Sequence, residues 1–480
     1  MTKEIGITVK KSNDFSDWYT QCVLKSSIAD YSPSKGFIIL RPYGYAIWEI
    51  IRELLDDELR KTGHKNGFLP VLIPESLLTK EKDHFDGFMP EVFWVTKSGD
   101  TDLGEKLAVR PTSETIAYSM FSKWISSYRD LPLKMNFWNS ALRAEIKSTK
   151  PLIRNSEFLW QEGHTAHKDE NEADEEVRLI LDIYKNLIEQ YLALPTLSGF
   201  KTDKEKFVGA KYTTCLESVM ADGKALQMAT SHQLGQNFSK PFEIKFLNKD
   251  TLEQFVWQTS WGISWRVIGA IIMVHGDDKG LILPPKISPT QVIIVPIYKD
   301  DSKTVVKQKA YELEQKLKDS KIRVQTDDRD EYTSGWKFND WEMKGVPLRV
   351  NVGLRDIKEN QVELIRRDTK ERFYVTEKEL VNQTLSTLEN IQSNMFDRAK
   401  SHLQENTRSA ATLEELLSVL DTSGGFVACS WCGKKECEDL VKEKTTADIR
   451  IVPFNPKNNI SSCIGCGEQE TIEVYFARAY

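Results

Sequence analysis

Apolar residues recur at helical spacing in two long segments of the chain. Between Pro42 and Lys61, isoleucines and leucines follow one another every three or four residues, and Gly63 comes soon after. The segment Asp174–Ala193 repeats this pattern, with acidic residues crowded at its start, where the helix dipole favours negative charge. The sequence therefore predicts an amphipathic helix over each of these two ranges.

Between and after these helices lie shorter segments that read as strands, most of them because apolar positions alternate with polar ones. They are Pro132–Ile146, Glu157–Ala166, Phe242–Leu247, Glu253–Ser260 and the wholly apolar Val267–Val274. Strands clustered between long helices favour an α+β fold, in which helices flank a mostly antiparallel sheet.

The second half of the chain is organised differently. A proline-rich stretch at 281–290 has the composition of a linker, and strand and helix patterns alternate over about 110 residues after it, which indicates a separate α/β domain. A helical pattern over Lys378–Asn406 then leads to a cysteine-rich end. A length of 480 residues suits about three domains, and we place them at 1–285, 286–400 and 401–480.

Composition narrows the class of protein. With 40% hydrophobic residues, 12 Trp, 15 Tyr and 21 Phe, the chain has ample material for packed cores and is not expected to be disordered. Its longest apolar run is Val267–Val274, far short of a membrane span, so we expect a cytoplasmic protein without a membrane partner. The net charge of −6 counts against a nucleic-acid partner, because a basic surplus is the usual footprint.

Five of the seven cysteines crowd the end of the chain: Cys429, Cys432, Cys437, Cys463 and Cys466. A terminal cluster in a large chain is typical of metal ligation, and a disulfide scaffold would spread its cysteines through a small secreted chain. By spacing alone, Cys429 and Cys432 pair with Cys463 and Cys466 as a tetrahedral zinc site.

The richest candidate chemistry lies between residues 136 and 167. Arg143 and Glu145 are two residues apart on a predicted strand, and the loop that follows, 147–155, is basic. The next strand would place four chemically mixed side chains on one face: Phe158, Trp160, Glu162 and His164. Such a hairpin can offer guanidinium groups to a phosphate and an aromatic ring to a base. An amphipathic hairpin with a buried Arg–Glu pair explains the same spacing equally well.

Other segments carry weaker signals. In Arg110-Pro-Thr-Ser-Glu114 a hydroxyl residue before an apolar helical run is most often a simple N-cap, although Thr112 and Glu114 could instead hold a cationic amine. The polar stretch 227–238 offers three possible ligand contacts, namely Gln227, Thr230 and His232. A lone histidine there is more often a structural hydrogen bonder.

In their order and wording these segments resemble the signature motifs of class II aminoacyl-tRNA synthetases, and most closely the archaeal and eukaryotic type of prolyl-tRNA synthetase. The phrases that carry the resemblance include Arg110-Pro-Thr-Ser-Glu-Thr115, Phe158-Leu-Trp-Gln-Glu-Gly-His164, Thr230-Ser-His232, Ser260-Trp-Gly262 and Gly353-Leu-Arg-Asp356. The resemblance covers residues 15–480. It implies activation of L-proline with ATP and Mg²⁺, transfer of the prolyl group to tRNA(Pro), and a homodimer whose interface includes Leu40–Pro74.

The resemblance also implies a role for each candidate residue. The residues expected to hold ATP are Arg143, Glu145, Arg154, Phe158, Gln227, Thr230 and Arg266, with Arg143 and Arg266 stabilising the reacting phosphates. The residues expected to hold proline are Thr112 and Glu114, which would receive its cationic imino group, together with Arg143, Trp160, Glu162, His164, His232, Trp261, Gly262 and Ser264 around its ring and carboxylate.

For the second domain the resemblance implies that two guanines of the anticodon are read by Glu342, Arg349, Arg355 and Asp356, although a solvated salt-bridged face would explain each of them equally well. For the third it implies a structural zinc held by Cys432, Cys437, Cys463 and Cys466, which leaves Cys429 out.

The short stretch from Arg143 to Arg266 leaves no room for an inserted editing domain.

Two alternative functions stay open on the sequence alone. One is another class II specificity, such as threonine. The other is a non-catalytic tRNA-binding paralogue, against which the presence of Arg143, Glu145 and Arg266 counts.

Overall fold

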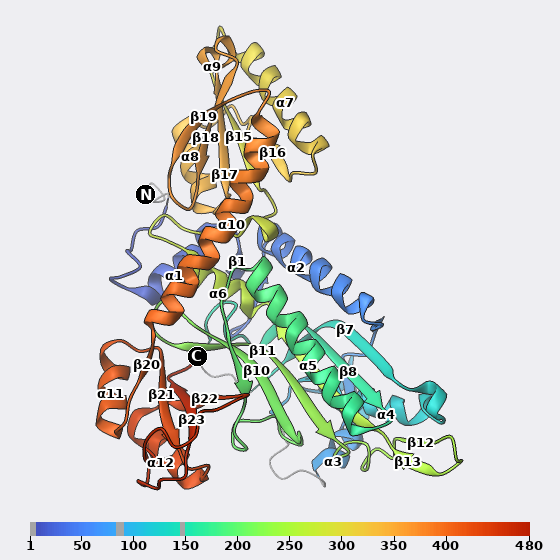
Figure 1. The fold of residues 1–480 in the computed structure, drawn as a ribbon. Coiled ribbons are helices and arrows are strands. Elements are labelled where there is room, and N and C mark those ends of the chain that lie inside the picture. The colour runs from blue at the N-terminus through green and yellow to red at the C-terminus, as the bar shows by residue number, and fades with distance from the viewer. Residues whose placement is uncertain (1–5, 83–90, 145–148) are drawn as a thin grey trace.

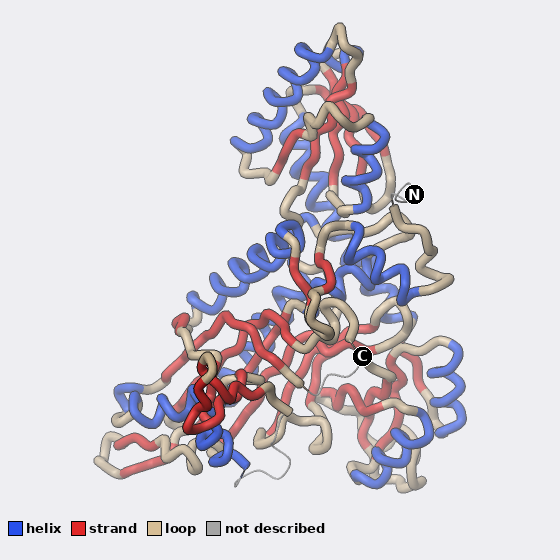
Figure 2. Tube along the Cα trace, turned by 180° about the vertical axis from the view of Figure 1, so that it is seen from behind, coloured by secondary structure: helices blue, strands red, loops and turns tan. Residues whose placement is uncertain are grey.

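The computed structural model describes residues 6–82, 91–144 and 149–480. A five-stranded unit stands at the top, above a broad main sheet whose C-terminal strands lie at one side (Figures 1 and 2). The long helix α10 (Leu380–Glu405) runs from the upper unit down to the C-terminal strands (Figure 1). None of the described helices combines the length and the apolar character that crossing a bilayer requires.

The main sheet contains eleven strands of the described chain, nearly all antiparallel to their neighbours. In order across the sheet they are β20 (Thr407–Ser409), β21 (Phe426–Trp431), β23 (Ile472–Ala477), β22 (Asp448–Pro453), β9 (Leu197–Phe200), β10 (Tyr212–Val219), β11 (Ala225–Gly235), β14 (Trp257–Ser264), β8 (Glu157–His167), β7 (Leu133–Leu142) and β3 (Lys65–Gly67). The predicted α+β class is therefore confirmed, and its strands extend into the cysteine-rich end.

Four helices pack into the core beside this sheet: α1 (Phe15–Lys25), α2 (Pro42–Lys61), α5 (Glu170–Asn186) and α6 (Arg266–His275). The helix predicted from the apolar period at Pro42–Lys61 is present with the same bounds. The second predicted helix starts earlier, because the side chain of Asp169 caps it by accepting a hydrogen bond from the backbone N–H of Glu172 at 2.9 Å. It ends in a π-helical turn at Leu187–Tyr191.

The strand predicted at Val267–Val274 is wrong, because these residues form helix α6. Val267, Ile268, Ala270, Ile271, Ile272 and Met273 are all fully or almost fully buried. A helix surrounded by protein on all sides has no polar face, so its sequence shows no period that would separate it from a buried strand.

Other strands differ in extent from the prediction. The segment Phe242–Leu247 is a strand only over β12 (Lys245–Leu247), and Glu253–Ser260 is split between β13 (Glu253–Phe255) and β14. Strand β7 ends at Leu142, so Arg143 follows the strand, although its backbone N–H still bonds to the carbonyl of Ser156 at 2.7 Å. Glu145 lies outside the described residues.

Two small sheets and two helices flank the main sheet near the N-terminal half. They are the hairpin of β1 (Ala29–Tyr31) and β2 (Ile38–Leu40), the sheet of β4 (Leu72–Pro74), β6 (Thr101–Val109) and β5 (Trp94–Ser98), and the helices α3 (Glu75–Lys82) and α4 (Glu114–Trp124). Ring contact between Phe37 and Phe93, with centroids 6.2 Å apart, joins the hairpin to the three-stranded sheet.

The upper unit is the predicted α/β domain. Its sheet has the order β16 (Val324–Thr326), β15 (Val292–Ile297), β17 (Leu348–Gly353), β18 (Gln361–Arg366) and β19 (Arg372–Thr376), packed with α7 (Lys303–Asp319), α8 (Ser334–Met343) and α9 (Leu354–Lys358). Strand β15 is parallel to both neighbours, as in a βαβ unit.

The C-terminal strands carry α11 (Leu413–Thr422) and α12 (Lys435–Thr445). Strand β22 pairs with β9, so that Val452 lies opposite Phe200 and joins this end of the chain to the main sheet. Beside that seam, the buried carboxylate of Glu217 accepts from Lys201 and Arg450, each at 2.6 Å. The boundaries at 285 and 400 stay predictions; the second falls inside α10.

Candidate active site

A cavity of about 380 Å³ opens on the main sheet against β8, β11 and β14. This volume is within the range of sites for small molecules. The described candidates for ATP and proline all line it: Thr112, Glu114, Arg143, Arg154, Phe158, Trp160, Glu162, His164, Gln227, Thr230, His232, Trp261, Gly262, Ser264 and Arg266. Residues that are more than 150 positions apart in the chain thus meet in one place.

The floor of the cavity is set by strand register. Glu162 of β8 and Thr230 of β11 both lie opposite Gly262 of β14, which has no side chain to fill the space between them. A second glycine, Gly163, permits close packing, since a Cβ there would lie 2.0 Å from the ring of Trp261. The predicted common face of Phe158, Trp160, Glu162 and His164 follows from the same alternation along β8.

One end of the cavity is acidic. Glu114, Glu162 and His164 are all at least 97% buried, and their ligand atoms lie within 4.8 Å of one another. Burial raises the pKa of Glu114, and the nearby charge of Glu162 adds to this effect. Burial opposes charge on His164 as well, but its contact with Glu162 at 3.3 Å and the proximity of Glu114 outweigh this and raise its pKa. The group therefore favours a second cation.

Ser113 is positioned at the start of α4 but does not act as a simple cap. Its side chain makes no capping bond to the helix. Instead its hydroxyl donates to Glu162, and its backbone N–H donates to the same carboxylate at 3.2 Å. The neighbouring Thr112 hydroxyl donates to Glu114. The hydroxyl residues of this segment thus orient the two carboxylates, which the N-cap interpretation did not predict.

The other end of the cavity is basic. The guanidinium of Arg266 donates to the carbonyls of Ile153 at 3.1 Å and Gln227 at 3.3 Å, which fixes its direction. Burial lowers its pKa to about 10, and the nearby Arg143 and Arg154 contribute to the shift. Three guanidinium groups that repel one another in a cavity form a site for a polyanion.

Aromatic rings cover this basic end. The guanidinium carbon of Arg143 lies 5.2 Å from the ring centroid of Phe158, which in turn meets Trp160 edge-on at 5.6 Å. Planar cations and flat rings stack favourably, and a purine base can take the same place on an aromatic face.

His232 lines the cavity as a neutral imidazole and does not supply a charge to it. Burial, together with the nearby His164, lowers its pKa to about 3, and its Nδ1 lies 2.9 Å from the hydroxyl of Thr213. The ring of Phe207 packs on it with centroids 4.9 Å apart. Phe207 and Glu205 also line the cavity, but they lie in an irregular segment without any pattern that sequence reasoning could have used. Asn139, which donates to Glu162 at 2.8 Å, was missed as well.

A second cavity, of about 350 Å³, lies in the upper unit and contains two of the four anticodon candidates, Glu342 and Arg349. The guanidinium of Arg349 lies 3.9 Å from the ring centroid of Phe338. Four further cations line the cavity: Arg366, Arg367, Lys370 and Arg372. Arg355 and Asp356 are not brought to it. The carboxylate of Asp356 caps α9 by accepting from the backbone N–H of Gly353, and Arg355 pairs with Glu359 at the surface.

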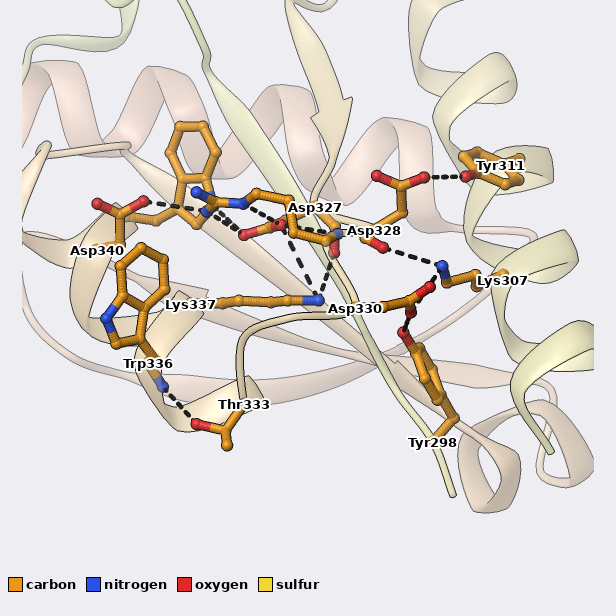
Figure 3. Close-up of polar contacts among 12 residues, drawn as sticks. Tyr298, Lys307, Tyr311, Asp327, Asp328, Asp330, Thr333, Trp336, Lys337 and Asp340 are labelled. Atoms are coloured by element: carbon orange, nitrogen blue, oxygen red, sulfur yellow. Dashed lines mark hydrogen bonds and ion pairs between the residues drawn. The ribbon is translucent and has the colours of Figure 1, made fainter. Parts of the chain in front are cut away.

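A buried network positions the helix that carries Glu342. Lys337 of α8 points toward Asp327, which follows β16, and donates to its carbonyl at 3.0 Å (Figure 3). Burial would raise the pKa of Asp327, but hydrogen bonds from Arg329 and from Trp341, the latter at 2.8 Å, outweigh it and lower the pKa. The network ties α8 to the edge of the sheet.

Four of the terminal cysteines meet at one point. The sulfurs of Cys432, Cys437, Cys463 and Cys466 lie within 4.8 Å of one another, and two of the separations are 3.6 and 3.7 Å. A tetrahedral site with sulfur ligands about 2.3 Å from zinc requires sulfurs roughly 3.8 Å apart, so the cluster suggests zinc. Cys429 is outside this group; its buried thiol lies 3.7 Å from the carbonyl of Val427.

Comparison with known proteins gives matches along most of the chain. Residues 93–275 match the class II tRNA synthetase core domain (G, H, P, S and T), 291–387 an anticodon binding domain, and 413–480 the prolyl-tRNA synthetase C-terminal domain. The proline–tRNA ligase of Cenarchaeum symbiosum is 55% identical over 99% of this chain and all of its own length. That of Natranaerobius thermophilus is 51% identical over 98% and 97%, and proline–tRNA ligase 2 of Bacillus cereus is 47% identical over both full lengths.

Proposed function

Because the chain belongs to the class II prolyl-tRNA synthetases and is a proline–tRNA ligase, we propose that the cavity on the main sheet is where L-proline and ATP react. The observation that carries this assignment is the division of one cavity into an acidic end at Glu114 and a basic end at Arg266. Full-length similarity to proline enzymes also sets aside threonine specificity and a non-catalytic role.

In this proposal the acidic end binds the cationic imino group of proline. Glu114 and Thr112 receive it, while Trp160, His164, His232 and Ser264 enclose the small ring and Gly262 leaves room for it. Glu162, held by Ser113 and Asn139, keeps His164 in place. The proline carboxylate then points along the floor toward Arg143.

The basic end binds ATP. Phe158 stacks on the adenine, Gln227 and Thr230 hold the ribose side, and Arg154 and Arg266 bind the outer phosphates; Glu145 remains a candidate for the adenine. The proline carboxylate attacks the α-phosphorus, an acyl-phosphate bond forms, and the bond to pyrophosphate breaks. The attacking group is already ionised, so no protein base is needed, and Arg143 and Arg266 stabilise the charge that develops.

Of the carboxylates that line the cavity, Glu114 and Glu162 are engaged by Thr112, Ser113 and His164, and Glu205 lies 3.8 Å from Arg450, so the protein would leave Mg²⁺ to the phosphates of ATP. When bound there, Mg²⁺ neutralises charge on the outer phosphates.

Replacing Glu114 with glutamine tests the acidic end. We expect the KM for proline in ATP–pyrophosphate exchange to rise by about tenfold or more, because a hydrogen bond to a charged group contributes about 1.5–3 kcal/mol. The raised pKa of Glu114 also predicts a pH dependence. As the pH falls toward that pKa the carboxylate is protonated and no longer attracts the cationic imino group, so the wild-type KM for proline should rise on acidification.

The KM for ATP serves as the internal control and should change little. Glu175→Gln, an exposed substitution of the same kind on α5, is the matched variant. Equal increases in both KM values in Glu114→Gln, or none, would contradict the assignment.

In the upper unit we propose that Glu342 and Arg349 read guanines of the anticodon, since arginine suits the O6 and N7 atoms of guanine and a carboxylate can accept from its amino group. Arg355 is a surface candidate for the same strand of RNA. Asp356 stays a candidate only if its capping bond to Gly353 breaks on binding.

We also propose a cytoplasmic homodimer. Large apolar side chains near the small sheets are exposed: Tyr31, Ile39, Tyr45, Phe68, Val71, Phe93 and Trp94. Phe68 is 86% exposed, and it lies within the segment that the family uses for its interface. An exposed cluster of this kind is typical of a surface that a partner covers.

Replacing Phe68 with aspartate should therefore yield monomers. Loss of a central aromatic anchor costs about 2 kcal/mol or more, which weakens association by about thirtyfold or more. Light scattering after gel filtration measures the mass directly. Leu252→Asp, at another exposed apolar residue on a different part of the surface, should leave the mass unchanged. A Phe68→Asp protein with unchanged mass would remove this face from the interface.

A further inference from the structure

A third cavity lies away from both sites described above. It has a volume of about 220 Å³ and lies between α6, α10 and the segment before α1. At roughly 30 Å³ per water, this is space for about seven water molecules. Helix α10, which supplies part of the lining, runs from the upper unit to the C-terminal strands (Figure 1).

The ionisable side chains of this cavity are all basic. They are Lys11, His275 of α6, and Arg398 and His402 of α10; the other lining residues are apolar, so no described residue that lines it carries a carboxylate. The acids near Lys11 are occupied: Asp278 accepts from the backbone N–H of Lys11 at 2.8 Å, and Asp277 pairs with Arg367 at 2.6 Å. Near His402, Glu405 favours the charged form of the imidazole.

Several of these donors lack an acceptor. His275 is only 9% exposed, and its Nε2 has no hydrogen-bond partner, although the carbonyls of Leu192 and Ala193 favour its charged form. The Nε2 of His402 is also buried without a partner at hydrogen-bond geometry, although the carbonyl of Met220 favours its charged form. Exposed Arg398 makes neither an ion pair nor a side-chain hydrogen bond with any residue in the described ranges. A buried polar group without a partner is costly, so something that accepts hydrogen bonds is expected here.

Burial also weakens the charge of this cluster. It lowers the pKa of Lys11 to about 8 and that of His275 to about 3. The Lys11 ammonium still donates to the carbonyl of Gly276 at 2.8 Å and lies 4.6 Å from the ring centroid of Trp18, so its direction is fixed. A bound anion would favour the charged forms of both groups.

We propose that this cavity binds a small phosphate-type oxyanion, with Arg398 and Lys11 supplying charge and His275 and His402 supplying N–H donors. The donors come from three separate parts of the chain: the segment before α1, α6 and α10. That arrangement matches a compact anion with several acceptor oxygens better than a planar carboxylate. Free orthophosphate, or the pyrophosphate released by amino-acid activation, can supply this chemistry.

The test is anion binding by the full-length protein. The active site is first saturated with L-proline and a non-hydrolysable ATP analogue whose outer phosphates occupy the positions at Arg154 and Arg266, so that added phosphates cannot bind there. Orthophosphate and pyrophosphate are then titrated separately by calorimetry. We expect at least one of them to bind, and Arg398→Gln and His402→Gln each to weaken that binding by about tenfold or more, as loss of a charge-assisted hydrogen bond does.

Lys400→Gln is the matched control, because it removes an exposed positive charge from the same helix outside the cavity. Its affinity for the anion should equal that of the wild type. Ala399→Leu, which fills the cavity without changing charge, should abolish binding. Binding of neither anion, or an unchanged affinity in Arg398→Gln, would overturn the proposal; a preference for one anion identifies the source.

Discussion

Replacing Arg266 with glutamine lowers kcat in proline-dependent ATP–pyrophosphate exchange by about 10²–10³-fold, the cost of removing one oriented donor from a developing negative charge. Arg266 is suited to this role because the carbonyls of Ile153 and Gln227 hold its guanidinium in place before any substrate binds. A group that needs no reorganisation stabilises the transition state more than a mobile one.

The comparison variant is Arg178→Gln, which removes an exposed arginine from α5 and should leave kcat unchanged. The KM for proline should change far less than kcat in Arg266→Gln, because the acidic end of the cavity is intact. A normal kcat with a raised KM for ATP would show instead that Arg266 only binds the nucleotide.

We propose that the four-cysteine cluster binds zinc, so replacing Cys437 with serine should release the metal, whereas Cys429→Ser should retain it. The sulfur of Cys437 lies 3.6 Å from that of Cys432, while Cys429 is outside the cluster. Structural zinc binds with an apparent free energy of about 10–16 kcal/mol in small zinc domains, so losing one of four ligands should reduce both metal content and stability.

Metal content by atomic spectroscopy and thermal unfolding of the same samples measure the two effects together. We expect close to one zinc per chain in the wild type and in Cys429→Ser, with a large loss and a lower melting temperature in Cys437→Ser. Loss of zinc in Cys429→Ser and its retention in Cys437→Ser would show instead that Cys429 and Cys432 bind it with Cys463 and Cys466.

The sequence predicted elements well where one side of an element faces water. Helix α2 has an apolar stripe and a polar face, so its bounds were predicted from the period together with Gly63 just after its end. Helix α6 is buried all round, and its eight apolar residues read equally well as a strand. The two helices differ because only α2 has a solvent-facing side, whose polar residues reveal the helical period.

For the site, the alternation along β8 predicted a shared face, but it could not say that Glu114 and Arg266 would lie in the same cavity. That depends on strand order, with β14 between β8 and β11, which no local pattern reveals. Resemblance to a family supplied the grouping. The net charge of −6 pointed away from a nucleic-acid partner, because it averages over a chain whose cations gather locally, as around Arg349.

The roles of Ser113 and Asp356 show a further limit. From sequence, Ser113 reads as a helix cap and Asp356 as a reader of RNA. In the structure Ser113 orients Glu162, and Asp356 is the cap. Both residues precede or begin a helix, so only the position of a distant partner distinguishes the two functions.

The pairing of β22 with β9 has a consequence for how this chain can be cut. Without the residues after 412, the N–H and C=O groups of β9 that now face Val452 and Pro453 would become an open sheet edge. The buried carboxylate of Glu217 would lose Arg450, one of its two partners. Exposed edges promote intermolecular pairing, so a shortened enzyme should aggregate rather than survive as a minimal catalyst.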